Sequence, residues 1–179
     1  GLMAEYCHKH AIGHLFLGHH QDDQAETLLF RLTKGSGLDG LCGMREIQEY
    51  NSDLKIVRPL LGVPKSEILN YCAAQKIEFV EDPSNDSERF ARVRLRKVLP
   101  ALEAEGLSNQ RLAQTAKRLA RARETLEILS DNLYKVSTII KNTKLTVLNL
   151  NELRAQPLEL VIRCILKTMN DVVPFLDYP

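Results

Sequence analysis

Residues 14–34 read HLFLGHHQDDQAETLLFRLTK and contain the change of period that decides the fold. The apolar run over residues 14–17 is typical of a short buried strand. From residue 22 onward apolar side chains recur at helical spacing, which predicts an amphipathic helix over residues 22–34. These apolar side chains belong to Ala25, Leu28, Leu29 and Leu32. The stretch therefore predicts a strand, a turn and a helix in that order.

The rest of the chain extends this alternation and then becomes helical. Strands and helices that alternate through the first 80 residues indicate an open α/β sheet. We expect strands over residues 47–50, 54–58 and 76–80, and helices over residues 2–11 and 65–75. Further on we expect helices over 89–99 and 108–134, a hairpin over 137–149, and a last helix over 151–170 that is interrupted near Gln156 and Pro157.

Leucines recur every seven residues along the 108–134 segment, at Leu112, Leu119, Leu126 and Leu133. This spacing is compatible with an intermolecular coiled coil, but it covers barely three heptads. We therefore favour one helix of a bundle within the chain.

Composition excludes several classes of protein. The chain has 179 residues, 44% apolar and 26% charged, which excludes a disordered or fibrous protein. No apolar run is long enough to span a membrane, and the first residues lack a signal-peptide pattern. The four cysteines are far apart and form no CxxC pair, which fits a reducing cytoplasm. Residue 1 is glycine within an apparent helix, so we expect the sequence to be a fragment.

Charge is unevenly distributed along the chain. Residues 89–123 hold ten of the 24 Lys and Arg residues but only two acids, Glu103 and Glu105. Such a segment points to a polyanionic partner, although a solvated helical face is the alternative. Within it Arg89, Arg92, Arg94, Arg96 and Lys97 alternate in part with apolar residues. Guanidinium groups at this density suit phosphate contacts, unless they form salt bridges to the acidic first part of the chain.

The densest group of chemically versatile side chains lies where the first strand ends and the helix begins. It contains His19, His20, Asp22, Asp23 and Glu26. In open α/β sheets ligands bind at this edge, so these side chains are suited to hold a metal, a cationic substrate or a proton. Asp23 and Glu26 also have the spacing of an acidic capping box, which is the structural alternative. All five histidines lie between residues 8 and 20, so the spacing does not favour zinc.

Residues 35–40 read GSGLDG and match the GxGxxG pattern of dinucleotide-binding proteins. That fingerprint requires a strand before it and a helix after it, whereas this stretch follows a helix, so the match is a decoy. Its glycines still allow the backbone to approach a phosphate, with Lys34 beside them.

Three separate stretches of the chain read LGHHQDDQAETLLFRLTKGSGLDGLCGM, RPLLGVPKSEI and EDPSNDSERFARVRLRKVLP. Together they resemble the bacterial tRNA(Ile)-lysidine synthases, which are pyrophosphatase-loop ATPases. The resemblance spans about residues 1–105. It implies the C-terminal part of a Rossmann-like, parallel-sheet nucleotide-binding domain over residues 1–100. It also implies a mainly helical tRNA-recognition domain over residues 101–179, which we expect to be truncated.

The resemblance implies a ligase that uses ATP and magnesium. Such enzymes adenylate the C2 oxygen of the wobble cytidine in isoleucine tRNA, and the ε-amine of free L-lysine then displaces AMP. The implied partners are isoleucine tRNA and free lysine, in the cytoplasm and without a membrane, with a homodimer left open.

The resemblance also implies roles for particular residues. Asp22, Asp23 and Glu26 belong to the lysine and metal side of the site, while His19 and His20 orient substrate or move a proton. Nucleotide or phosphate binding falls to Lys34, Gly35, Gly37 and Arg58. The tRNA-binding positions are Arg89, Arg92, Arg94, Arg96 and Lys97. Which carboxylate binds lysine and which binds metal stays open.

Two features depart from the family pattern. The serine-glycine-glycine-x-aspartate-serine loop that cradles the pyrophosphate of ATP does not occur in these 179 residues, so we expect no lysidine synthesis by this chain alone. Ser87 stands where the family usually has aspartate, with Asp86 beside it.

Two other functions remain as alternatives. One is another pyrophosphatase-loop ATPase, such as a tRNA thiolase or an amidotransferase synthetase, although thiolases commonly need reactive or cluster-binding cysteines. The other is a non-catalytic RNA-binding module that uses residues 89–123.

Overall fold

The computed structural model describes residues 1–80, 91–142 and 145–172, without the side chains of Arg92 and Val172. The chain forms two compact units, Gly1–Ala120 and Arg121–Pro179. The division of the chain at residue 100 into a nucleotide-binding domain and a tRNA-recognition domain stays a prediction. Arg89, Asp86 and Ser87 lie outside the described residues.

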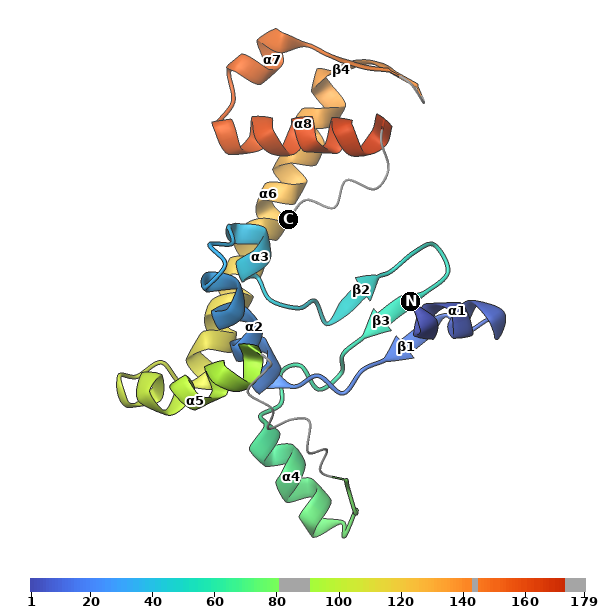
Figure 1. Ribbon diagram of the computed structural model, residues 1–179. Helices are drawn as coiled ribbons and strands as arrows, with labels where there is room; N and C mark the ends of the chain where they lie inside the picture. Colours follow the sequence, from blue (N-terminus) through green and yellow to red (C-terminus); the bar gives the residue numbers. More distant parts are fainter. Residues whose placement is uncertain (81–90, 143–144, 173–179) are drawn as a thin grey trace. The chain divides into compact units, whose positions relative to one another are not determined.

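The first unit alternates strands and helices, as the sequence predicts (Figure 1). Its elements are α1 (Leu2–Lys9), β1 (His14–Phe16), α2 (Gln21–Leu32), α3 (Leu38–Leu41), β2 (Ile47–Glu49), β3 (Lys55–Val57), α4 (Lys65–Ala74), α5 (Ala91–Ala104) and the first part of α6 (Asn109–Ser137). The mixed α/β class, with a helical part after it, is confirmed.

A three-stranded sheet with the order β1-β3-β2 sets the position of the helix α2. β1 pairs in parallel with β3, with Leu15 opposite Ile56, whereas β2 pairs antiparallel with β3. The carboxyl ends of β1 and β3 therefore lie at the same edge. The N–H of Gln21, the first residue of α2, donates to the Val63 carbonyl at 3.0 Å and fastens the two exits together.

One apolar cluster holds α2 against α5 and α6. Ala25 of α2 and Ala116 of α6 are completely buried in this cluster. Leu28 and Leu112 are also buried, and Leu99 of α5 packs against the cluster. Burying each leucine contributes about 1.5–3 kcal/mol. The cluster therefore fixes the N-terminal half of α2 against two helices from much later in the sequence.

Two expectations about secondary structure were wrong. Residues 76–80 form no strand: Lys76 has φ 54°, and the Ile77 N–H donates to the Cys72 carbonyl at 2.9 Å, so this segment closes the end of α4. Its apolar side chains, such as Val80 at 94% exposure, are not buried as a central strand requires. Pro100 does not end α5, which continues to Ala104 because packing of Leu99 offsets the cost of one missing backbone donor.

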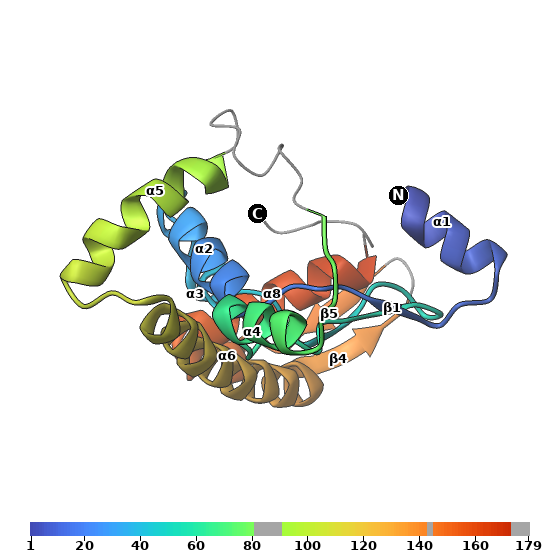
Figure 2. The same cartoon turned by 90° about the horizontal axis from the view of Figure 1, so that it is seen from below.

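The second unit is built from the end of α6, the hairpin of β4 (Thr138–Lys141) and β5 (Thr146–Leu148), and the helices α7 (Leu150–Arg154) and α8 (Leu158–Val172). The predicted pairing of two strands is confirmed, and Figure 2 labels both β4 and β5. The predicted break at Gln156 and Pro157 is also confirmed, since it separates α7 from α8 (Figure 1). None of the described helices combines the length and apolar character that a membrane crossing requires.

The heptad leucines of α6 are used inside the chain. Leu112 and Leu119 belong to the cluster around α2. Leu126 and Leu133 pack in the core of the second unit, with Leu153, Leu160 and the fully buried Cys164. This packing agrees with the interpretation of α6 as a helix of a bundle.

Tyr134 is the polar anchor of the second unit. The ring is 6% exposed, and its hydroxyl donates to the Asp171 carboxylate near the end of α8. The Lys141 ammonium donates to the same carboxylate at 2.7 Å. The pKa of Asp171 is lowered, first by the hydrogen bond from Lys141 and then by that from Tyr134.

We predict that acid weakens the second unit through Asp171. A carboxyl group whose folded pKa is lowered stabilises the fold above its unfolded pKa, of about 3.9, and this contribution is lost as pH falls through the folded value. Asp171→Asn should lower the urea midpoint at pH 7 and flatten its dependence on pH below about 4. Glu105→Gln, at an exposed site, is the control, and equal pH profiles for wild type and Asp171→Asn would contradict the prediction.

Candidate functional site

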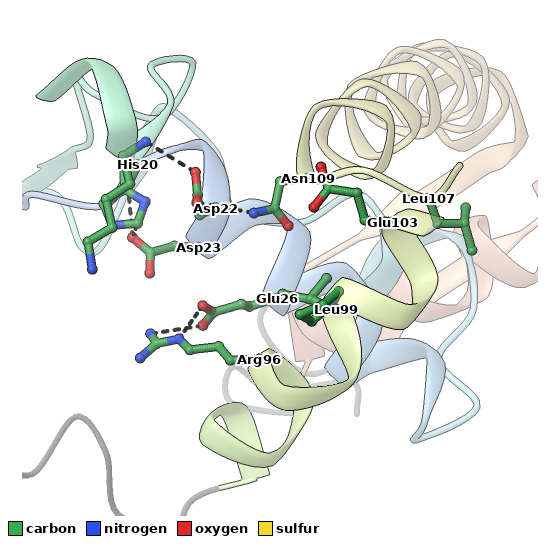
Figure 3. Close-up of a pocket in the computed structure, with 11 residues that line it drawn as sticks. His20, Asp22, Asp23, Glu26, Arg96, Leu99, Glu103, Leu107 and Asn109 are labelled. Carbon is green, nitrogen blue, oxygen red and sulfur yellow. Dashed lines mark hydrogen bonds and ion pairs between the residues drawn. The ribbon is translucent and has the colours of Figure 1, made fainter. Parts of the chain in front are cut away.

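A cleft of about 610 Å³ opens at the N-terminus of α2 (Figure 3). It is lined by side chains from α2, α4, α5 and α6, all in the first unit. The lining residues are His20, Asp22, Asp23, Glu26, Lys65, Arg96, Leu99, Pro100, Glu103, Leu107 and Asn109. Four of the five residues predicted as catalytic therefore line one cleft. The fifth, His19, is half-buried beside it and is not among the lining residues.

His20 and Asp23 form the cap of α2. The His20 backbone N–H donates to Asp23 Oδ2 at 2.9 Å, and His20 Nδ1 lies 3.4 Å from the same oxygen. His20 is thus the N-cap residue and Asp23 the third helical residue. The expected capping box of Asp23 with Glu26 is wrong, because α2 begins at Gln21 and Glu26 lies beyond its first turn.

Asp22 joins three helices. Its Oδ1 accepts the backbone N–H of Lys65, the first residue of α4, at 3.1 Å. Its Oδ2 accepts the side-chain amide of Asn109, the first residue of α6, at 3.1 Å. With both oxygens engaged, Asp22 shapes the cleft by fixing its walls.

Glu26 is a buried carboxylate paired with a half-exposed guanidinium. Glu26 is 3% exposed, and its two oxygens accept Arg96 Nε at 2.5 Å and Nη2 at 3.2 Å. This two-point geometry satisfies both oxygens and compensates the cost of burying the charge. Arg96, predicted to bind tRNA, therefore joins α5 to α2. This contact is of the kind that the alternative interpretation, salt bridges from the basic segment to the first part of the chain, predicts.

The remaining charge of the cleft is negative. Among the described residues, Asp23 Oδ1 and the Glu103 carboxylate accept no hydrogen bond. Four carboxylates line the cleft against two cations, Lys65 and Arg96. Such a balance attracts a cation, and a primary ammonium has the donors that free carboxylate oxygens accept.

The residues predicted to bind nucleotide lie elsewhere. Lys34 is exposed just after the far end of α2, with its ammonium 5.6 Å from the centre of the Phe30 ring. Gly35 has φ 68° in the same turn, and Gly37 begins α3. Their role in phosphate binding stays a prediction, but it concerns a surface outside the cleft.

Arg58 is buried and engaged within the sheet region. It donates to the Arg45 carbonyl at 2.8 Å and to the Gln48 side-chain oxygen at 3.2 Å. Burial lowers the pKa of its guanidinium. Arg58 therefore holds the strand β2 to the exit of β3 in this structure.

The residues predicted to bind tRNA fall on or before α5. Arg94, Arg96 and Lys97 lie on exposed positions of this helix and all have interactions within the protein. Arg89 and the side chain of Arg92 lie outside the described part of the chain.

Several cleft residues were not anticipated from the sequence. Asn109, Glu103 and Lys65 line the cleft from three helices. Lys65 lies in the stretch RPLLGVPKSEI, which did not indicate a role for it, and Glu103 and Asn109 lie outside all three stretches. Gln24 was also missed: its side-chain amide exchanges two hydrogen bonds, of 2.8 and 2.7 Å, with the backbone of Met44. The glycine at position 43 is the sequence feature that accompanies this contact. Gly43 has φ 70°, and a Cβ atom there would lie 2.5 Å from Gln24 Oε1.

Within the described residues no group of three His, Cys, Asp or Glu side chains is arranged to hold a metal ion. Asp22 instead binds the first residues of α4 and α6, and Glu26 binds Arg96.

We predict a strong coupling between Glu26 and Arg96. Arg96→Met leaves the buried carboxylate without its partner and should lower the free energy of unfolding by about 2–3 kcal/mol, less than for a fully buried pair because Arg96 is half-exposed. The double variant Arg96→Met, Glu26→Gln should recover more than about 1 kcal/mol of that loss in urea denaturation. Arg154→Met, an exposed control, should change stability by less than about 0.5 kcal/mol. Additive effects of the two substitutions would show that the pair is not coupled.

Comparison with known proteins identifies the family. The family model described as "PP-loop domain" matches residues 1–102. The tRNA(Ile)-lysidine synthase of Bradyrhizobium diazoefficiens is 43% identical over 130 residues, which cover 73% of this chain and 36% of that protein. The tRNA(Ile)-lysidine synthase of Rhodopseudomonas palustris is 36% identical over 171 residues, covering 94% of this chain and 49% of that protein. That of Methylobacterium nodulans is 43% identical over 130 residues, or 73% of this chain and 38% of that protein.

The chain spans between about a third and a half of the length of these curated relatives. The resemblance stated from the three sequence stretches is therefore confirmed by relatives that carry the same name. Because the family model covers more than half of its residues, the chain belongs to the PP-loop domain family.

Proposed function

We propose that the protein containing this chain ligates lysine to C2 of the wobble cytidine of isoleucine tRNA, in an ATP-dependent reaction. The observation that carries the proposal is the acidic cleft at the start of α2, where Asp23 keeps one carboxylate oxygen open beside the buried Glu26. The names of the relatives support the reaction and its two substrates.

Lysine would bind through its ε-ammonium. Asp23 Oδ1 would accept one N–H of the ammonium, and the negative charge of Glu103, which also lines the cleft, would favour its entry. Glu26 would not bind the ammonium directly, because Arg96 occupies both of its oxygens. Asp23 is thereby favoured as the lysine-binding carboxylate, and Glu26 as the residue that holds Arg96 at the rim.

An amine must lose a proton before it can attack. His20 lines the cleft, and its Nδ1 lies 3.4 Å from Asp23 Oδ2. A neutral imidazole beside a carboxylate is suited to take the proton from the bound ammonium, because the resulting imidazolium is stabilised by that carboxylate. His20 would therefore be the group that makes the lysine nucleophilic.

ATP, when bound, would activate the C2 oxygen of the cytidine by adenylation, and magnesium would neutralise its phosphates. The described cleft does not by itself fit a triphosphate, because carboxylates outnumber cations in it. The roles derived above accordingly concern lysine and its proton only. A cytoplasmic location and a homodimer stay predictions.

The thiolase alternative has less support from the described residues. Cys7, Cys42 and Cys164 are buried, and Cys72 is half-buried on α4. None lines the cleft. An attacking sulfur would have to come from a more exposed, activated cysteine.

We predict that the protein encoded by the complete reading frame incorporates radiolabelled lysine into isoleucine tRNA when ATP is present. Asp23→Asn should lower incorporation at least 100-fold, since the neutral amide lacks the negative charge that pairs with the ammonium. Lys9→Gln, on the exposed helix α1, should leave incorporation unchanged.

Two results would contradict the proposed function. One is absence of lysine incorporation by the complete protein while sulfur or another amine is incorporated. The other is full activity of the Asp23→Asn variant, which would move lysine binding away from this cleft.

A further inference from the structure

Among the described residues, Lys65 is the cation of the cleft whose charged group has no partner. Its backbone N–H donates to Asp22 Oδ1, but its ammonium makes no hydrogen bond or ion pair within the described part of the chain. The other cation that lines the cleft, Arg96, is paired with both oxygens of Glu26 (Figure 3). The Lys65 ammonium is therefore the positive group of the cleft that is open to a ligand.

We infer that Lys65 binds the α-carboxylate of the lysine substrate and makes the cleft selective for a diamino acid over a simple diamine. The inference rests on the proposed function and deepens it, because it adds a specificity-determining residue to the same site. The open groups of the cleft match the two ends of lysine. Asp23 Oδ1 accepts from the ε-ammonium, and the Lys65 ammonium donates to the carboxylate.

Two backbone contacts fix the position from which the Lys65 side chain extends. The Gln21 N–H donates to the Val63 carbonyl at 3.0 Å, and the Lys65 N–H donates to Asp22 Oδ1 at 3.1 Å. Both contacts join the start of α4 to the first turn of α2, where Asp23 lies. Ligand binding by Lys65 therefore requires the ordering of one side chain and no movement of the backbone.

Without Lys65 the cleft would favour a bare diamine over an amino acid. Its carboxylates outnumber its cations by two, so its field attracts a ligand more strongly the more positive that ligand is. Cadaverine, which is lysine without the carboxylate, keeps both ammonium groups and carries one more positive charge. Selection of the amino acid therefore needs a cation that pairs with the carboxylate and disfavours the diamine. Lys65 meets both requirements.

A phosphate group is the other anion that a lysine ammonium binds. The surroundings of Lys65 disfavour it, because the carboxylates of the cleft repel a polyanion such as a triphosphate. The carboxylate of lysine enters together with two ammonium groups, so the same carboxylates attract the ligand as a whole. An amino-acid carboxylate is therefore the better match for Lys65.

The test is a calorimetric titration of the 179-residue chain with L-lysine and with cadaverine. The variant Lys65→Met keeps the backbone N–H that binds Asp22 and replaces the charged side chain by an apolar one. It should weaken lysine binding about 10-fold, as expected for one charge-assisted hydrogen bond at an exposed position. Cadaverine binding should stay unchanged or become tighter, because a repelling charge is removed. Lys65→Arg should keep most of the lysine affinity, and Lys9→Met, on the exposed helix α1, should change neither ligand.

The opposite effects on the two ligands separate a carboxylate contact from a general effect of charge. Loss of a cation from an acidic cleft, on its own, strengthens the binding of every ligand with a net positive charge. Lysine and cadaverine binding that change alike in Lys65→Met therefore overturn the inference, and so does absence of lysine binding by the chain. Unchanged lysine binding also overturns it, and a simultaneous loss of inorganic triphosphate binding would assign Lys65 to a phosphate group instead.

Kinetics of the complete protein separate this inference from the proposed function. Lys65→Met should raise KM for lysine about 10-fold with little change in kcat, because the carboxylate is remote from the amine that reacts. If the complete protein incorporates no lysine into tRNA, the proposed function fails, but the inference stands when the chain distinguishes lysine from cadaverine through Lys65. If incorporation occurs and KM is unchanged in the variant, the inference fails and the proposed function stands.

Discussion

The ion pair between Glu26 and Arg96 is the interaction on which the cleft depends. Glu26 lies on the buried side of α2, where an unpaired carboxylate would be very costly, and Arg96 reaches it from α5, seventy residues later. The pair therefore sets the distance between two walls of the cleft. Asp22 does the same for α4 and α6 through two further hydrogen bonds.

This arrangement divides the acidic residues of the first motif by role. The carboxylate oxygens of Asp22 and Glu26 accept hydrogen bonds from other helices, whereas Asp23 keeps one oxygen that accepts none from the described residues. Carboxylates that look equivalent in the sequence thus differ in what they can bind. The same helix that buries Leu28 and Ala25 in the apolar cluster presents Asp23 to the cleft, so binding geometry and fold stability share one element.

Local patterns predict the elements well where their periodicity is strong. The strand before α2, the strands around residues 51–53, the helix α4 and the break before α8 follow from apolar spacing and turn residues. Residues 76–80 look like a strand because β-branched and aromatic residues cluster there, but the chain offers them no described partner and Lys76 closes α4 instead. Pro100 predicts a helix end that tertiary packing overrides.

The cleft itself is only half predictable. The motif of histidines and carboxylates marks one wall, because polar side chains after a strand meet at the ligand-binding edge of the sheet. The opposite wall depends on contacts between residues separated by 70 and 87 positions, and neither Arg96 nor Asn109 carries a local signal of its partner. Arg58 is the opposite case. A sequence motif marks it as a phosphate-binding residue, but it is buried and donates to the Arg45 carbonyl.

The most direct test of this account is an NMR titration of the ¹⁵N-labelled chain with L-lysine. The account predicts shifts of the backbone amides of His20, Asp23 and other residues that line the cleft, and their loss with norleucine, which has no ε-amine. Asp23→Asn should abolish these shifts while the spectrum of the remaining residues stays that of the folded protein. Shifts elsewhere, or equal shifts with norleucine, would contradict the claim that this cleft binds an ammonium group.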